Sequence, residues 1–316
     1  MAMDDLHANS STLTFLPPIN NTAFFRNSSM TFNSSTHRKH QSSNNTTVIA
    51  IRTIIAVVGT IGNLCLLAAA WKDRTSRAGT RVLIINLAAS SFLFVAPGQA
   101  VMMVYLYSPL ANPCPFFIFD TILATAANWS DVSLAFNRMI AVCYPHHYRR
   151  VSSCKAGGLI CAVTWLLSGL IVGLSASGFG SWFKEVRPGL CLPVAASPLG
   201  TFWTMAMTPI PIAVFGLIIL RITVTFVAER KTGNRLAPVN VPSAASKQKG
   251  TDRKKALARA MIASFAWCFC STVPYLVIAS FIPTFTARYP VALEALRLVF
   301  ISEYAINPVN FSCIII

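Results

Sequence analysis

Five ionisable side chains stand inside long apolar stretches of this sequence, and they are its strongest candidates for chemistry. A charge within a membrane-spanning helix is costly unless it is paired or hydrated, so each is a functional candidate. Three are candidates for a ligand pocket, namely Asp120, Glu294 and Arg297. The other two, Asp131 and Glu303, form a candidate intramembrane acid pair.

The partners of these residues are open at this point. Asp120 forms an internal ion pair with Arg297, or it stays free for a cationic ligand, or Arg297 pairs instead with Glu294, three residues away on one helix face. Asp131 and Glu303 either share a proton or hold a cation, or they are neutral and packed.

Histidine and cysteine give no sign of a metal site. The cysteines lack the CxxC spacing of a zinc framework. All five histidines fall in polar segments: His7, His37, His40, His146 and His147. We therefore expect no metal, no cofactor and no metal-dependent membrane hydrolase, so the chain is not predicted to be an enzyme.

The stretches that carry the charges are long enough to cross a membrane. Hydrophobic residues make up 54% of the chain and charged ones 11%, less than half of the roughly 25% typical of soluble domains. A spanning helix needs about 20 apolar residues. Seven stretches qualify: 48–71, 82–107, 114–144, 156–179, 201–228, 256–282 and 290–316. We predict an all-α integral membrane protein in which residues 48–316 form a seven-helix bundle in the bilayer.

The distribution of positive charge predicts the orientation. Of the 26 Lys and Arg residues, 18 lie in three connections, Lys72–Arg81, Arg138–Lys155 and Arg221–Arg259. An excess of Lys and Arg marks cytoplasmic loops, so the N-terminus is expected outside. Because these segments are not interleaved with aromatic residues, we do not expect binding to nucleic acid.

The N-terminal segment 1–47 is polar and rich in Ser, Thr and Asn, and is predicted to be a disordered, glycosylated extracellular tail. Six N-x-S/T acceptors support this interpretation: Asn9, Asn20, Asn27, Asn33, Asn44 and Asn45. No cleavable signal with an apolar core precedes the tail. Residues 229–255 mix Pro, Gly, Ser and Lys and are expected to be a flexible third cytoplasmic loop, with helices five and six continuing into its two ends.

Short motifs fall one per helix in a recognisable order: GTIGNLCLL (59–67), NLAAS (86–90), NRM (137–139), Pro274-Tyr275 and NPVNF (307–311). Together they resemble the rhodopsin-like (class A) G-protein-coupled receptors over residues 48–316. The resemblance implies a role for each matching residue. It makes Asn63 a polar anchor between helices, and Trp165, Pro211 and Pro274 positions of helix packing and kinking.

The same resemblance implies a switch at the cytoplasmic end of helix three, formed by Asn137, Arg138 and Pro145. It also implies a helix-seven motif, which is Asn307, Pro308 and Phe311, and an extracellular disulfide between Cys114 and Cys191. Both cysteines would face the oxidising side of the membrane.

Several positions depart from the family pattern. Ser90-Ser91 stands where an aspartate is expected, and Thr272 where helix six has a tryptophan. Phe311 replaces a tyrosine, and Asn137 replaces the aspartate that usually holds the arginine. Asn-Arg at this place also occurs in the melatonin receptors and the Moody-like insect receptors. A weak inactive-state lock is therefore expected, with signalling in the absence of ligand.

The implied function is that of a multi-pass plasma-membrane receptor. It would transduce an unknown extracellular ligand to a heterotrimeric G protein by outward movement of helix six. The altered switch residues leave open a decoy or scavenging receptor that does not signal. A transporter is the remaining alternative, but the chain shows no internal repeat and an odd helix count. The chain ends five residues after Phe311, where relatives continue, so either the gene prediction is incomplete or the arrestin-recruiting tail is lacking.

Overall fold

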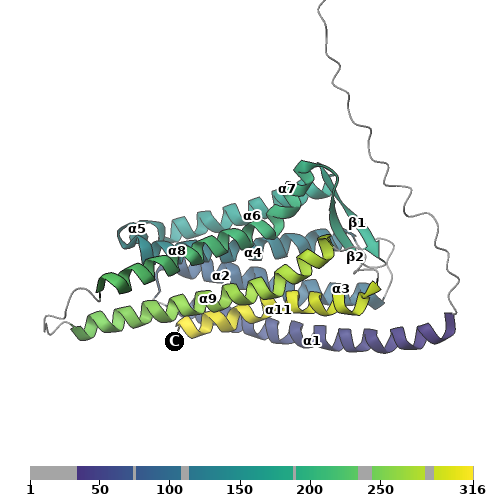
Figure 1. Cartoon of the computed structure of the whole chain (residues 1–316), viewed down its shortest axis with the longest axis horizontal. Helices are drawn as coiled ribbons and strands as arrows, with labels where there is room; N and C mark the ends of the chain where they lie inside the picture. The colour runs from purple at the N-terminus through teal and green to yellow at the C-terminus, as the bar shows by residue number, and fades with distance from the viewer. Residues whose placement is uncertain are drawn as a thin grey trace, which may run out of the picture. The chain divides into compact units, whose positions relative to one another are not determined.

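A computed structural model describes residues 34–73, 76–107, 114–187, 190–233, 244–281 and 288–315. The chain divides into two compact units, Met1–Ser43 and Asn44–Ile316, and the second contains the bundle. The helices of this unit run side by side (Figure 1).

Long helices correspond to all seven predicted stretches. Their bounds are α1 (Ser34–Lys72), α2 (Ala78–Leu93) with η2 (Phe94–Gly98) and α3 (Gln99–Tyr107), α4 (Cys114–Cys143), α6 (Cys154–Ala176), α7 (Pro198–Met207) with α8 (Pro209–Gly233), α9 (Ala244–Phe281) and α11 (Pro290–Ile315). A short helix, α5 (Pro145–Val151), follows α4. Within the described residues, five spans are long and apolar enough to cross a membrane by composition alone; α4 and α11, which carry most of the buried charges, are the exceptions.

Helices extend beyond the apolar runs into two polar segments, and for the loop 229–255 this was expected at both ends. Helix α1 begins at Ser34, within the segment 1–47 that was predicted to be disordered. No proline or glycine stands between Ser34 and the apolar run, so nothing in that segment stops the helix from propagating toward the N-terminus. Helices α8 and α9 likewise extend into the expected loop, as far as Gly233 and from Ala244.

The second predicted span is continuous but not uniform. Residues Phe94–Gly98 form a π-helical bulge that contains Pro97, between α2 and α3. Proline lacks an N–H group and clashes with the preceding turn, and a π-bulge accommodates both effects. Gly98, in the bulge, and Gln99, directly after it, are both buried.

The fifth span is interrupted at Thr208, between α7 and α8. Its backbone (φ −141°, ψ −51°) departs from the helix directly before Pro209, since proline disfavours a helical conformation at the residue that precedes it. The interruption therefore lies three residues before Pro211, the predicted kink, and directly before Pro209. Pro211 removes the donor that would reach the Met207 carbonyl, and Asn128 supplies its amide N–H there instead (3.3 Å).

Apolar clusters hold the bundle together. One joins α4, α8 and α9 through Val132, Phe215, Ile219 and Met261, and another joins α1, α2 and α4 around Leu87. Many large apolar side chains remain exposed around the outside, including Leu166 at 74%. In a bilayer these side chains face lipid, so their exposure is expected of a membrane protein.

A β-hairpin follows α6 and was not expected from an all-α prediction. Strands β1 (Ser181–Arg187) and β2 (Leu190–Ala195) pair antiparallel, with Trp182 opposite Val194. Gly178 and Gly180, with φ of 86° and 85°, allow the turn that leads into it. A disulfide between Cys114 and Cys191 (Cα–Cα 5.2 Å) fixes β2 to the first residue of α4. Figure 1 shows the hairpin at the end of the bundle where α4 begins.

Candidate functional site

A cavity of about 860 Å³ lies beneath β2 and is lined by residues of η2, α3, α4, α7, α8, α9 and α11. Its volume is typical of sites that enclose small molecules. The disulfide keeps Cys191 and its neighbours over the cavity, because β2 cannot move independently of the start of α4. The predicted pocket residues Asp120 and Arg297 both line it.

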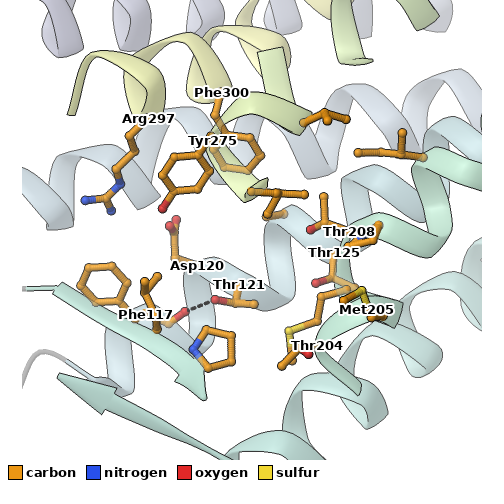
Figure 2. A pocket seen from close by; sticks show the side chains of 18 of the residues that line it. Phe117, Asp120, Thr121, Thr125, Thr204, Met205, Thr208, Tyr275, Arg297 and Phe300 are labelled. Carbon is orange, nitrogen blue, oxygen red and sulfur yellow. Dashed lines mark hydrogen bonds between the residues drawn. The ribbon is translucent and has the colours of Figure 1, made fainter. Parts of the chain in front are cut away.

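One end of the cavity is charged. Asp120 and Tyr275 point toward one another there, and the Arg297 guanidinium extends to the side, over Phe117, while Thr125, Thr204 and Thr208 lie toward the other end (Figure 2). The Arg297 guanidinium lies 5.5 Å from the centre of the Phe117 ring, which is a cation–π contact.

The ion pairs differ from the first alternative considered above. Glu294 is 3.7 Å from Arg297, three residues along α11, and its other oxygen is 3.2 Å from Arg52 of α1. In the part of the chain that the structure describes, no ion pair joins Asp120 to Arg297. The buried Oδ1 of Asp120 also has no hydrogen-bond partner there.

Arg52 is a functional candidate that sequence reasoning missed. Its side chain is 1% exposed, and it lies within electrostatic range of Asp120 and Arg297 as well as Glu294. The available signal was a single arginine inside an apolar stretch, AIRTII. Its place near the start of the helix makes it resemble an interfacial arginine, which ordinarily extends to the membrane surface.

The π-bulge of the second span positions the Asp120 carboxylate. A Cβ added at Gly98 would lie 2.7 Å from Asp120 Oδ1, so a larger residue here would displace the carboxylate from its position. The next residue, Gln99, is 2% exposed, and its Oε1 has no hydrogen-bond partner among the described residues. Two buried acceptors therefore border the charged end.

The rest of the wall is apolar and hydroxyl-bearing. Five threonines line it, namely Thr121, Thr125, Thr201, Thr204 and Thr208. Most bond to backbone or to a neighbour, but Thr125, at 1% exposure, has no hydrogen-bond partner among the described residues for its Oγ1.

Below the cavity, Glu303 joins α11 to α9. It is 2% exposed and accepts hydrogen bonds from the hydroxyls of Thr272 and Ser271. Thr272 occupies the position where the family pattern has tryptophan, so a polar contact stands in place of that ring. Asp131 is also buried, at 7% exposure, on α4. The hypothesis that Asp131 and Glu303 form an acid pair stays a prediction.

Buried amides cross-link the helices at the same depth. Asn63 donates to the carbonyl of Tyr304 (3.1 Å), which ties α1 to α11. The Tyr304 hydroxyl donates to Asn128 on α4 (3.0 Å). Trp165 donates to Asn86 (2.9 Å), which itself donates to Ser130, so α6, α2 and α4 are joined. Asn63 and Trp165 are thus members of this network, as is Asn128, which was not singled out from the sequence.

The predicted switch lies at the far end of α4. Asn137 and Arg138 are 2% and 6% exposed. Asn137 donates to Thr80 of α2 (3.0 Å), and Thr80 also contacts the Tyr148 hydroxyl of α5 (3.0 Å). Pro145 is the first residue of α5 and is exposed.

Other predicted residues lie outside what the structure describes in detail. Residues 1–33 and the side chains of 34–45 are among these, and they hold the six glycosylation acceptors, Asn9, Asn20, Asn27, Asn33, Asn44 and Asn45. The backbone of α11 includes Asn307, Pro308 and Phe311, but their side chains are also outside the described set. Pro274 lies within α9, which continues through it without a break.

Comparison with known proteins identifies the family. The profile of the family described as "7 transmembrane receptor (rhodopsin family)" matches residues 62–310. The D(1B) dopamine receptor of Mus musculus is 31% identical over 124 residues, 38% of this chain and 26% of that protein. The adenosine receptor A2a of Cavia porcellus is 25% identical over 130 residues, which are 40% and 32% of the two chains. The matched stretch is thus under two thirds of either relative.

Solved structures agree on the fold. Squid rhodopsin superposes with a TM-score of 0.66 at 17% identity, and the match covers 82% of this chain and 74% of that one. At this identity the likeness concerns the fold alone. The family is one of receptors and not of enzymes, and the matched profile spans most of the sequence. The chain is a multi-pass membrane protein that belongs to the rhodopsin family of seven-transmembrane receptors.

Proposed function

We propose that the chain is a plasma-membrane receptor that binds a small extracellular ligand and activates a heterotrimeric G protein. The observation that carries the proposal is the placement of two sites on one helix. Asp120 faces the cavity and Arg138 is buried near the other end of α4, 18 residues away. At 1.5 Å per residue they lie about 27 Å apart, close to the thickness of the bilayer core.

Contacts between aromatic rings connect the cavity to the middle of the bundle. Tyr275 stacks on Phe300 (5.3 Å between ring centres), and Phe300 contacts Tyr304 edge-on (5.6 Å). Tyr304 then bonds to Asn128, and its neighbour Glu303 holds α9. A ligand that binds the open state more tightly would shift the equilibrium toward outward movement of α9.

The Asn137 contact supports a weak inactive-state lock. An aspartate at this position would hold Arg138 by charge, whereas Asn137 has none and donates its amide to Thr80. We therefore expect G-protein activation above that of empty cells, measured without added ligand at matched surface expression. Arg138→Ala should reduce it to the level of empty cells, and Arg149→Ala, which removes an exposed arginine of α5, should leave it unchanged.

The same measurement separates a signalling receptor from a decoy of the same fold. A decoy reaches the cell surface and shows neither basal nor ligand-dependent activation. Basal activity equal to that of empty cells would refute the weak lock, and the absence of any ligand response across a broad screen would refute signalling.

A further inference from the structure

The charged end of the cavity is electrically balanced but incompletely paired. It contains two arginines, Arg52 and Arg297, and two acids, Asp120 and Glu294. If each arginine formed a closed ion pair with one acid, no charged side chain would remain to bind a charged ligand. Instead Glu294 contacts both arginines, at 3.2 Å and 3.7 Å.

Because Glu294 contacts both arginines, one positive and one negative side chain remain available at this end of the cavity. Arg52, which is fully buried, makes the closer contact with Glu294, so Arg297 has only a longer and divided one. Arg297 lines the cavity at 12% side-chain exposure. Asp120 faces the same space, with a buried oxygen that has no hydrogen-bond partner among the described residues. The end thus presents a positive group and a negative group side by side without net charge.

Resting on the proposed function, we propose that the ligand is an amphiphile with a zwitterionic head of the α-amino-acid type. Its ammonium group donates hydrogen bonds to Asp120 and to the buried Oε1 of Gln99. Its carboxylate accepts from Arg297. A simple amine satisfies Asp120 but adds positive charge next to two arginines, and a simple carboxylate leaves Asp120 and Gln99 without donors.

The remainder of the cavity defines the body of the ligand. Phe117 and the stacked Tyr275–Phe300 pair border the head group, and Met205 and Ile212 lie farther in. A volume of about 860 Å³ accommodates more than one aromatic ring. The expected body is therefore an extended apolar group, with a single polar atom that reaches the unpartnered hydroxyl of Thr125.

Three probes that share one body test the head group. They are 4-phenyl-L-phenylalanine, 2-(biphenyl-4-yl)ethylamine and 3-(biphenyl-4-yl)propionate, which carry both charges, the ammonium only and the carboxylate only. Binding to the purified full chain in lipid nanodiscs is measured by calorimetry. We expect the zwitterion to bind at least about ten-fold more tightly than either other probe, since each lost charge-assisted hydrogen bond is worth that much.

Substitutions show which side chain binds each charged group of the probe. Asp120→Asn should weaken the zwitterion and the amine at least about ten-fold and leave the carboxylate unaffected. Arg297→Gln should weaken the zwitterion and the carboxylate at least about ten-fold and leave the amine unaffected. Arg288→Gln is the matched control, because Arg288 is exposed and does not line the cavity. Since a variant can fail to fold, the ranking of the three probes on the unaltered chain stands as an independent test.

Two outcomes overturn the proposal. If the amine binds as tightly as the zwitterion, Asp120 alone selects the ligand. If none of the three binds, the charged end does not take this head group. Either result leaves the proposed function intact when G-protein activation without ligand persists, because that measurement requires no probe.

Discussion

The buried position of the Arg52 guanidinium is energetically unfavourable unless the charge is paired. Arg52 is 1% exposed in a membrane-spanning helix, and it forms an ion pair with Glu294 at 3.2 Å. Arg52→Met removes the closer contact of Glu294, but Glu294 is 27% exposed and keeps its contact with Arg297 at 3.7 Å, so the cost should be below the roughly 3–5 kcal/mol of breaking a fully buried ion pair. We therefore expect Arg52→Met to lower the thermal unfolding midpoint of the receptor in nanodiscs, and Arg288→Met, at an exposed site, to leave it unchanged.

The pairing can be tested separately from the burial. In the double variant Arg52→Met/Glu294→Gln, neither member of the pair remains charged. Its loss of stability should be smaller than the sum of the two single losses, because residues in direct contact are coupled. Additive losses would show that the two side chains do not depend on each other.

At the scale of residues, the sequence predicted which charged side chains are buried better than it predicted their ion-pair partners. Rarity of charge in apolar runs was enough to single out Asp120, Glu294 and Arg297, and two of these line the cavity. Which acid meets which arginine depends on how α1 and α11 are rotated against each other, and that is set by long-range packing. Gln99 and Asn128 were missed because an uncharged amide in an apolar run has no comparable signal.

At the scale of elements, close approach of α2 and α6 depends on a pair of glycines. A Cβ at Gly157 would lie 2.8 Å from the carbonyl oxygen of Gly79, whereas one at the adjacent Gly158 would meet nothing within 4 Å. Forcing a side chain into such a contact costs roughly 1–3 kcal/mol. Gly157→Leu should therefore reduce surface expression and thermal stability. Gly158→Leu, its matched control, should not, and equal effects of the two would contradict the helix crossing described here.

The contact between α9 and α11 leads to a second prediction about elements. Glu303 accepts from Thr272, and Thr272→Val removes this hydroxyl at nearly constant volume. The buried carboxylate then loses a donor, which costs roughly 1–3 kcal/mol in the closed state. If outward movement of α9 is the activating step, basal G-protein activation should rise several-fold.

Ser302→Ala provides the control for that measurement. Ser302 precedes Glu303 on α11, and among the described residues its hydroxyl donates to the carbonyl of Val299 on the same helix. Basal activation that falls, or that stays equal to the unaltered receptor at matched surface expression, would exclude the Glu303 contact as a restraint on α9.

The sequence predicted the long helices well and their irregularities poorly. Length and hydropathy are local properties, so all seven stretches were found. The bulge at Pro97 and the interruption at Thr208 depend on whether neighbouring helices satisfy the freed backbone groups, as Asn128 does for Met207. The hairpin at Ser181–Ala195 was missed because its strands are short and contain Lys184, Glu185 and Pro193, which do not alternate cleanly with apolar residues.

At the scale of the whole molecule, the fold and the charge distribution together favour one orientation in the membrane. The ends of α4 distinguish the two faces of the bundle. Its first residue is tied by disulfide to the hairpin over the cavity, and its last turns lie beside the basic segment 138–155. Disulfides persist on the oxidising side of a membrane, and positive loops stay on the cytoplasmic side. Both therefore support the predicted orientation, with the cavity outside and Arg138 inside.

This orientation predicts which parts of the chain antibodies and enzymes reach on intact cells. An epitope tag at the N-terminus should be bound without permeabilisation, and a tag inserted within residues 234–243 only after it. Treatment with an N-glycosidase should lower the apparent mass of the receptor. The shift should disappear when six acceptors are changed to Gln, which are Asn9, Asn20, Asn27, Asn33, Asn44 and Asn45. Because positive loops direct orientation, the tag pattern should persist in that variant. If antibodies bound the N-terminal tag only after permeabilisation, the bundle would have the opposite orientation. The cavity would then lie on the cytoplasmic side, where an extracellular ligand could not enter it.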